Sequence, residues 1–253
     1  MTNSIGMKFV LIPPGEFDMG SGPEEVQRLR SDFSAQKAPQ RLIDRIPAET
    51  PQHRVRITGA FYMGVCEVTQ AQYERVMGSN PSHFKRCGPD APVEHVSWTD
   101  AAEFCQRLSK MDEEHAEYRM PTEAEREHAC RAGTTTRFCF GDSRAHLVEY
   151  AWVVKNTRGQ TEPVGQKKPN PFGLYDVYGN VHEWCRDWYA EDYYADSPRS
   201  DPPGPGEGTK RVFRGGTWAS WELDCRSARR QGAEPGSQSF YRGFRVTCSP
   251  SGK

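Results

Sequence analysis

The chain has 253 residues, a net charge of −1 and a hydrophobic share of 36%. A charge so close to zero does not favour nucleic acid or an anionic membrane as a partner. No apolar run approaches the roughly 20 residues that span a bilayer, and the apolar run near the N-terminus is too short for a secretory signal. We therefore expect a cytoplasmic protein, or a secreted one if a leader has been removed.

The N-terminal part carries two strand patterns on either side of a polar segment. Residues 7–20 predict a strand, a Pro-Pro-Gly turn and a second strand. Residues 21–50 are polar and charged, so we expect a surface insertion there, either a long loop or a short helix. Residues 53–65 alternate apolar and polar positions around a glycine, which predicts a strand pair.

Three short helices are expected next, each with a start and a stop signal. The first covers about 70–77 and the second about 100–111. The third follows Thr122, which forms a capping box with Glu125, and it ends at Gly133.

The rest of the chain predicts short strands between turns. Residues 196–209 are rich in proline and glycine and are expected to form a surface loop. The pattern shows no internal repeat and no linker. The sequence therefore predicts a single α+β domain over residues 1–253, with three short helices and short antiparallel strands.

Seven motifs in a fixed order run through nearly all of the chain. They are FVLIPPGEFDMGS (9–21), EVTQAQYERVMGSNPSHF (67–84), PVEHVSW (92–98), RMPTEAEREHACRAGTTT (119–136), PVGQKKPNPFGLYDVYGNVHEWCRDWY (163–189), RVFRGGTW (211–218) and YRGFRV (241–246). Together they resemble the formylglycine-generating enzymes, also called sulfatase-modifying factors. The resemblance implies a C-type-lectin-like fold with little regular secondary structure.

The segment 176–183 has the chemistry of a calcium site. Asp176 and Glu183 offer hard oxygen ligands, and Gly179 permits a tight turn between them. Calcium takes about six to eight such oxygens. The resemblance implies a structural calcium ion held by these two side chains and by the carbonyls of Gly179 and Val181. The alternative is that Asp176 is a turn residue and Glu183 is a buried ion-pair partner.

The signature segment, Arg214–Cys225, reads RGGTWASWELDC. In active members of the family two cysteines hold copper, and the enzyme oxidises a substrate cysteine to formylglycine. Here Ser220 and Cys225 stand at the two cysteine positions, and Thr217 stands at the position of the family's serine. A serine hydroxyl is a poor ligand for soft Cu(I), which prefers thiolates. Copper is therefore doubtful as a cofactor, and so is a catalytic role of Cys225, Ser220 and Thr217.

Other positions also depart from the family pattern. His182 and Asp224 replace aromatic residues, and Arg126 replaces the tryptophan of a Glu-Trp-Glu-Tyr motif. Imidazole suits copper and iron. His182 is the one histidine that the resemblance brings near Cys225, so a Cys225/His182 metal site stays open.

The eight cysteines contain no Cys-x-x-Cys pair, which does not favour structural zinc. Most of them read as small buried hydrophobic residues, and one or two disulfides are the alternative. The resemblance implies bridges from two helical cysteines to the C-terminal region. The nearest pairs that this chain offers are Cys105 with Cys248 and Cys130 with Cys225.

Two functions of different classes follow. The first is a binding or accessory module, because the region from Trp218 to Tyr241 is rich in the aromatic residues and arginines that dominate binding hot spots. The second is an O2-dependent oxidoreductase that converts a sulfatase cysteine to formylglycine, or a related metal-dependent oxidase. For the first we expect a monomer that binds a protein, peptide or small molecule. Its expected ligand contacts are Trp218, Trp221, Asp224, His182 and Arg226.

Overall fold

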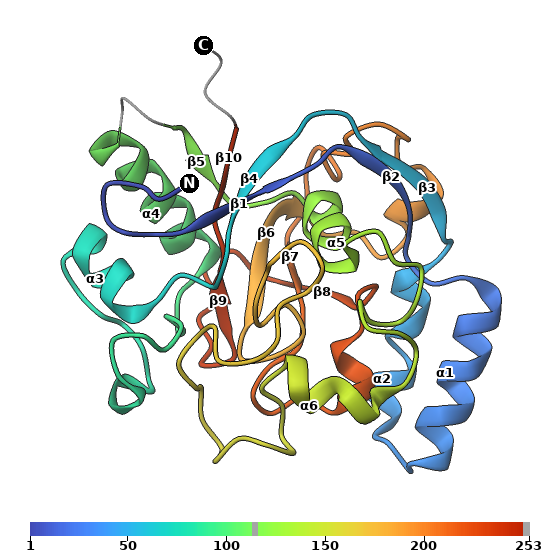
Figure 1. Cartoon of the computed structure of the whole chain (residues 1–253). Helices are drawn as coiled ribbons and strands as arrows, with labels where there is room; N and C mark the ends of the chain where they lie inside the picture. The colour runs from blue at the N-terminus through green and yellow to red at the C-terminus, as the bar shows by residue number, and fades with distance from the viewer. Residues whose placement is uncertain (113–115, 250–253) are drawn as a thin grey trace.

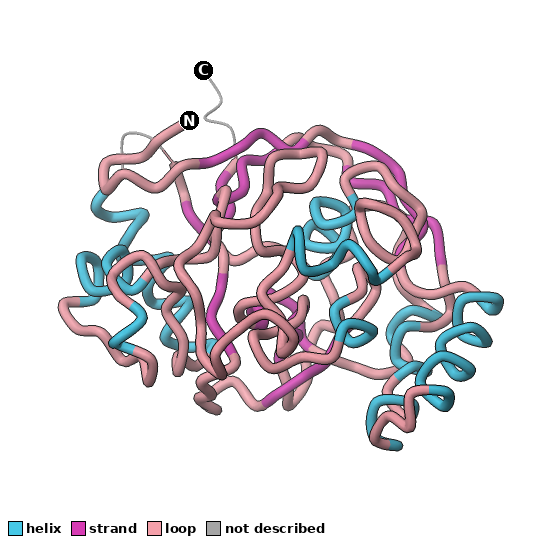
Figure 2. The backbone as a smooth tube through the Cα atoms, turned by 60° about the horizontal axis from the view of Figure 1, so that its bottom comes forward, coloured by secondary structure: helices cyan, strands magenta, loops and turns pink. Residues whose placement is uncertain are grey.

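The elements of regular structure are short, and loops join them over much of the molecule (Figures 1 and 2). The computed structural model describes residues 1–112 and 116–249. Its strands are β1 (Phe9–Ile12), β2 (Gly15–Met19), β3 (His53–Ile57), β4 (Phe61–Gly64), β5 (Tyr118–Arg119), β6 (His182–Trp188), β7 (Arg211–Arg214), β8 (Arg230–Ala233), β9 (Arg242–Phe244) and β10 (Thr247–Cys248). Its α-helices are α1 (Pro23–Ala35), α2 (Gln40–Ile43), α3 (Gln70–Met77), α4 (Trp98–Met111), α5 (Glu123–Arg131) and α6 (Leu147–Tyr150).

A four-stranded sheet in the order β8-β7-β6-β9 lies at the centre (Figure 1). β7 is antiparallel to both β6 and β8, whereas β9 is parallel to β6. The short antiparallel strands expected from the sequence are thus present, together with one parallel pair. Because β8 and β9 are the two edge strands of this sheet, the connection over residues 234–241 crosses from one edge to the other.

The two N-terminal strand patterns pair with each other rather than within themselves. β1 pairs with β4, with Ile12 opposite Phe61, and β2 pairs with β3. The strands expected in 7–20 and 53–65 are thus present, but the strand pair predicted within 53–65 is wrong. β4 also pairs with β10, so the first and last strands of the chain share one sheet.

The three predicted helices are present as α3, α4 and α5, and a capping box starts each of them. The hydroxyls of Thr69, Ser97 and Thr122 accept a hydrogen bond from the backbone three residues on, and the side chain at that position binds back. α5 ends at Arg131, because Ala132 adopts the left-handed conformation that terminates helices. Three helices is nevertheless too few, because α1, α2 and α6 are also present.

The polar segment 21–50 holds two of these extra helices, α1 and α2, and α1 is the longer. Pro23 at its first position and two glutamates in its first turn favour a helix start. Leu29 and Phe33, one turn apart, form its buried face. They belong to a small hydrophobic cluster of Leu29, Phe33, Leu42, Ile46 and Leu223. Since Leu223 lies in the signature segment, the insertion packs directly against that segment.

Residues 196–209 hold no helix or strand, only a single bridge from Ser200 to β3. All eight cysteines are free thiols, so neither Cys105–Cys248 nor Cys130–Cys225 is bonded. Across the described ranges 1–112 and 116–249, no helix has both the length and the apolar character needed to cross a membrane.

Candidate functional site

Two glycines bring the signature segment back against its own end as it leaves β7. Gly215 has φ = 80°, a conformation that costs glycine little. A Cβ on Gly216 would lie 2.4 Å from the Sγ of Cys225 and 2.4 Å from the carbonyl oxygen of Tyr178. Gly216 therefore allows the thiol of Cys225 to pack against the backbone, which is a local reason for the Gly-Gly pair.

The three predicted catalytic residues lie together behind these glycines. The backbone N–H of Thr217 donates to Oγ of Ser220 at 3.0 Å, and the two hydroxyl oxygens are 3.1 Å apart. The thiol of Cys225 donates to the carbonyl oxygen of Trp221 at 3.3 Å and also interacts with the Ser220 hydroxyl. All three side chains are buried, and Cys225 is 0% exposed.

This arrangement does not fit a copper ion. Burial raises the pKa of the Cys225 thiol well above its ordinary value, and the charges of Asp224 and Glu222 raise it further. Cu(I) binds thiolates, and the second position offers only the hydroxyl of Ser220. Within the part of the chain that the structure describes, no group of three or more His, Cys, Asp or Glu side chains is placed to hold a metal.

His182 contacts the start of the signature segment at Gly215. Its Nδ1 lies 2.8 Å from the carbonyl oxygen of Gly215, so Nδ1 carries the proton and Nε2 is left as an acceptor. Its ring packs on Phe213 with centroids 4.9 Å apart. Burial lowers the pKa of His182 to about 4. The imidazole is therefore neutral at pH 7, hydrogen-bonded to Gly215 and packed on Phe213.

Two of the predicted ligand-contact residues, Arg226 and Asp224, are already engaged in buried ion pairs. Arg226 is 3% exposed and donates to both carboxylate oxygens of Glu49, at 2.6 and 2.8 Å. Asp224 is 8% exposed and pairs with Arg229. These residues hold the loop in place instead of presenting free charges to a ligand. The sequence identifies these residues as charged, but it does not reveal that their charges are already paired inside the protein.

The two predicted tryptophans do reach the surface. Trp218 stacks on Tyr241 with ring centroids 5.1 Å apart and meets Phe84 edge-on at 5.4 Å. His83 lies 5.4 Å from Phe240, and Phe240 is 36% exposed. Trp221 is 39% exposed. We call the connected rings the aromatic face, which consists of His83, Phe84, Trp218, Phe240 and Tyr241.

Among the predicted calcium ligands, Glu183 is already bound by two arginines. Its carboxylate oxygens accept hydrogen bonds from Arg126 at 2.7 and 3.1 Å and from Arg245 at 3.1 and 3.0 Å. Burial acts to raise the pKa of Glu183, but the two guanidinium charges outweigh it and hold that pKa below the ordinary value. The geometry matches the alternative of a buried ion-pair partner.

The other three predicted ligands lie in the same buried turn. One oxygen of Asp176 accepts a backbone hydrogen bond at 2.7 Å, and Oδ1 has no hydrogen-bond partner. Burial raises the pKa of Asp176 to about 6. Val181 donates its N–H to Glu67 at 3.1 Å. A Cβ on Gly179 would lie 2.2 Å from the carbonyl oxygen of Trp152, so this turn packs closely. With both of its carboxylate oxygens bound by arginines, Glu183 does not fit the role of a calcium ligand.

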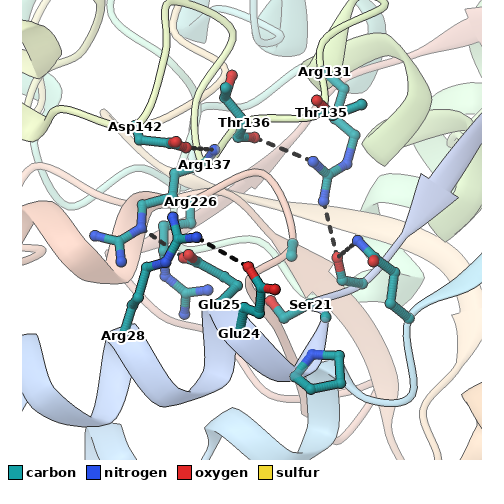
Figure 3. A pocket seen from close by; sticks show the side chains of 15 residues that line it. Ser21, Glu24, Glu25, Arg28, Arg131, Thr135, Thr136, Arg137, Asp142 and Arg226 are labelled. Atoms are coloured by element: carbon teal, nitrogen blue, oxygen red, sulfur yellow. Dashed lines mark hydrogen bonds and ion pairs between the residues drawn. The ribbon is translucent and has the colours of Figure 1, made fainter.

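A polar cavity of about 390 Å³ opens where α1 meets the body of the protein (Figure 3). The charged groups around it pair mostly with their neighbours. Nε of Arg137 lies 2.7 Å from Glu25, and Arg131 donates to two backbone carbonyls at 3.0 and 3.2 Å. Arg226, at its edge, is bound to Glu49. The cavity therefore lies between the insertion and the body, and the three arginines named here already have partners within the protein.

Three residues that shape this region were not predicted from the sequence: Glu49, His83 and Phe84. Glu49, the partner of Arg226, lies 177 positions away in the insertion, and no local pattern marks it. His83 and Phe84 fall inside a recognised motif, where an aromatic residue after an Asn-Pro turn could have suggested an exposed ring.

Known proteins resemble this chain over most of its length. A family model described as Sulfatase-modifying factor enzyme 1-like domain matches residues 2–249. A formylglycine-generating enzyme of Streptomyces coelicolor is 39% identical over 172 residues, which cover 62% of this chain but only 52% of that protein. Treponema denticola variable protein 1 is 31% identical with a TM-score of 0.80, and the match covers 99% of this chain and 98% of that one. PvdO from Pseudomonas aeruginosa is 26% identical, also with a TM-score of 0.80, over 97% and 95% of the two chains. The chain therefore belongs to the sulfatase-modifying factor family.

Proposed function

We propose that this chain is a ligand-binding or accessory member of its family and that the aromatic face is its contact surface. The observation that carries the proposal is the set of five connected rings, of which Phe240 is 36% exposed. Connected apolar surface of this kind marks interaction sites, and aromatic anchors dominate binding energy. A peptide or protein segment with apolar side chains suits such a surface best.

The anchor of the aromatic face is held in place before any ligand binds. The backbone N–H of Trp218 donates to the carbonyl oxygen of Asn180 at 2.8 Å, and its indole N–H donates to that of Phe240 at 3.3 Å. An anchor that is already ordered loses little side-chain entropy on binding. The buried ion pairs of Asp224 and Arg226 also help to keep Trp218 in place, because they fix the loop that follows it.

A second candidate function is the oxidation of a substrate cysteine to formylglycine, or a related metal-dependent oxidation. Two observations favour it: Ser220 and Cys225 lie side by side, and the Streptomyces relative carries the name of that enzyme. The buried thiol, the raised pKa of Cys225 and the missing second thiolate count against it. We therefore rank it second.

A peptide selection tests the first proposal. The purified chain is screened against a random displayed peptide library, and the affinities of enriched peptides are measured by calorimetry. Trp218→Ala should weaken them at least about tenfold, as expected for a hot-spot aromatic. The control is Val154→Ala, because Val154 is a hydrophobic residue outside the aromatic face and is 55% exposed. Equal affinities for wild type and Trp218→Ala protein would contradict the proposal.

A separate assay tests the second candidate. The chain is incubated with Cu(I), O2 and a Cys-x-Pro-x-Arg peptide, and aldehyde is measured by hydrazide labelling. We expect no aldehyde above the level of copper alone. Enzyme-dependent aldehyde would establish the oxidase function whatever the peptide selection finds.

A further inference from the structure

Two arginines surround Glu183 and the turn that leads to it. Arg126 and Arg245 together donate four hydrogen bonds to its two carboxylate oxygens. They also donate to carbonyl oxygens of the same turn, Arg126 to that of Val177 at 2.8 Å and Arg245 to that of Tyr175 at 2.8 Å. One buried carboxylate and two nearby carbonyls are thus held by guanidinium N–H groups.

These oxygens are of the types that a hard divalent cation binds, namely carboxylate and backbone carbonyl. In this chain two guanidinium groups bring two positive charges to them. The side chains of Arg126, Arg245 and Glu183 are at most 2% exposed. The planar guanidinium group matches a carboxylate with two parallel hydrogen bonds. A calcium ion added at Glu183 would face two fixed like charges where screening by water is weak.

We infer that Arg126, together with Arg245, takes the role that the family resemblance assigns to a calcium ion, so that the turn 176–183 is held without a divalent cation. Arg126 stands where the family pattern has tryptophan, and an uncharged side chain there would leave Glu183 with one guanidinium partner. This inference does not depend on the proposed function.

The position of Arg126 explains how one side chain can stabilise several segments. It projects from α5, whose start is fixed by the Thr122 capping box. Its Nη2 would lie 3.3 Å from a Cβ on Gly215, so the guanidinium group sits beneath the start of the signature segment. The hydrogen bonds of Arg126 therefore join α5 to the turn 176–183, and its guanidinium group lies against the start of the signature segment.

The test measures bound metal and melting temperature on the whole purified chain. Atomic emission should find no stoichiometric calcium in the wild-type protein, and its Tm should differ by less than about 1 °C between excess EDTA and excess calcium. A calcium ion at about 100 times its Kd would instead raise Tm by about 5–10 °C. Equimolar calcium, or a fall of that size in EDTA, would overturn the inference.

Two variants on the same helix test the role of the guanidinium itself. Arg126→Met uncovers part of the Glu183 carboxylate and should produce a calcium-dependent rise in Tm. Arg131→Met is the matched control, because Arg131 is also buried and paired, with Glu127 at 2.8 Å, but does not touch Glu183. A calcium response in both variants, or in neither, would overturn the assignment to Arg126. If Arg126→Met protein does not fold, the wild-type measurements decide alone.

Discussion

The carboxylate of Glu49 lies 2.6 and 2.8 Å from the two terminal nitrogens of Arg226. Glu49 is 0% exposed, and Ser21 donates a further hydrogen bond to it at 2.8 Å. Burial acts to raise the pKa of Glu49, but Arg226, Arg229 and Ser21 together outweigh it and lower that pKa. This ion pair, and the packing of Leu223 against α1, fix the insertion 21–50 to the end of the signature segment.

Breaking this ion pair should destabilise the whole protein. Arg226→Met leaves the charge of Glu49 buried without its main partner, so the free energy of unfolding should fall by about 3–5 kcal/mol. Urea unfolding measures the change. Removing one partner of the exposed pair Arg28–Glu24, by Arg28→Ala, should cost no more than about 0.5 kcal/mol. Equal losses of unfolding free energy in the two variants would show that the buried pair stabilises the protein no more than the exposed pair does.

A second variant separates the charge effect from the loss of packing. In the double variant Glu49→Gln/Arg226→Met the buried charge at position 49 is removed together with that of its partner. Its free energy of unfolding should therefore be higher than that of Arg226→Met alone. A further loss instead of a recovery would mean that Glu49 stabilises the fold through Ser21 or Arg229, its other neighbours.

Restoring the second thiol should create a copper site. Ser220 already lies beside Cys225, so Ser220→Cys would place two soft ligands together. Changes in a metal's outer shell alone cost about 10–100-fold in affinity, so gaining a whole ligand should raise Cu(I) affinity at least about 100-fold. Anaerobic titration against a chelator measures this, with Ser220→Ala as the control. Equal affinities of the Cys and Ala variants would show that the alignment of this segment with the copper enzymes is wrong.

The signals that could be predicted from the sequence are local ones. The capping boxes at Thr69, Ser97 and Thr122 each need only four consecutive residues, so the starts of three helices follow from the printed sequence. Strand pairing depends on distant segments, which is why β4 was expected to pair with its neighbour β3 and instead pairs with β1 and β10.

The same distinction explains the outcome at the candidate site. The family resemblance implied that Thr217, Ser220 and Cys225 share one site, and the structure brings them together where the segment folds back at its two glycines. Whether an arginine is a free ligand contact or a buried ion-pair partner depends on residues far away in the chain. Arg226 was expected to contact a ligand, and only the folded structure reveals that its guanidinium group is already paired with Glu49.

Thiol labelling should show that Cys225 is inert in the folded protein. Only Cys66 and Cys87 are partly exposed, and the other six thiols are buried. A disulfide reagent such as DTNB should therefore react with no more than these two thiols before unfolding. Cys225→Ser should leave the fast phase unchanged, whereas Cys87→Ser should reduce it. A fast phase that loses one thiol in the Cys225→Ser protein would mean that the signature segment opens readily, as an oxidase would require.

Stability should depend on pH through Glu94, which holds the loop of the aromatic face. Oε1 of Glu94 accepts the N–H of Phe84 at 2.7 Å, and Oε2 is buried without a hydrogen-bond partner. Burial raises the pKa of Glu94 to about 7. Since the unfolded carboxyl titrates near about 4.3, the folded state binds more protons between about pH 4.5 and 7, and stability falls as pH rises through this window.

Glu94→Gln keeps the acceptor for Phe84 and removes the ionisation. Between pH 5 and pH 8 the wild-type protein should lose on the order of 1–3 kcal/mol more unfolding free energy than this variant. Asp176, whose pKa is raised to about 6, acts in the same direction in both proteins and cancels in the comparison. Glu103→Gln, at an exposed position on α4, is the control and should keep the wild-type slope. Parallel slopes for wild type and Glu94→Gln would show that Glu94 does not titrate in this range. A steeper wild-type slope would mean that the loop carrying His83 and Phe84 is held most firmly below neutral pH.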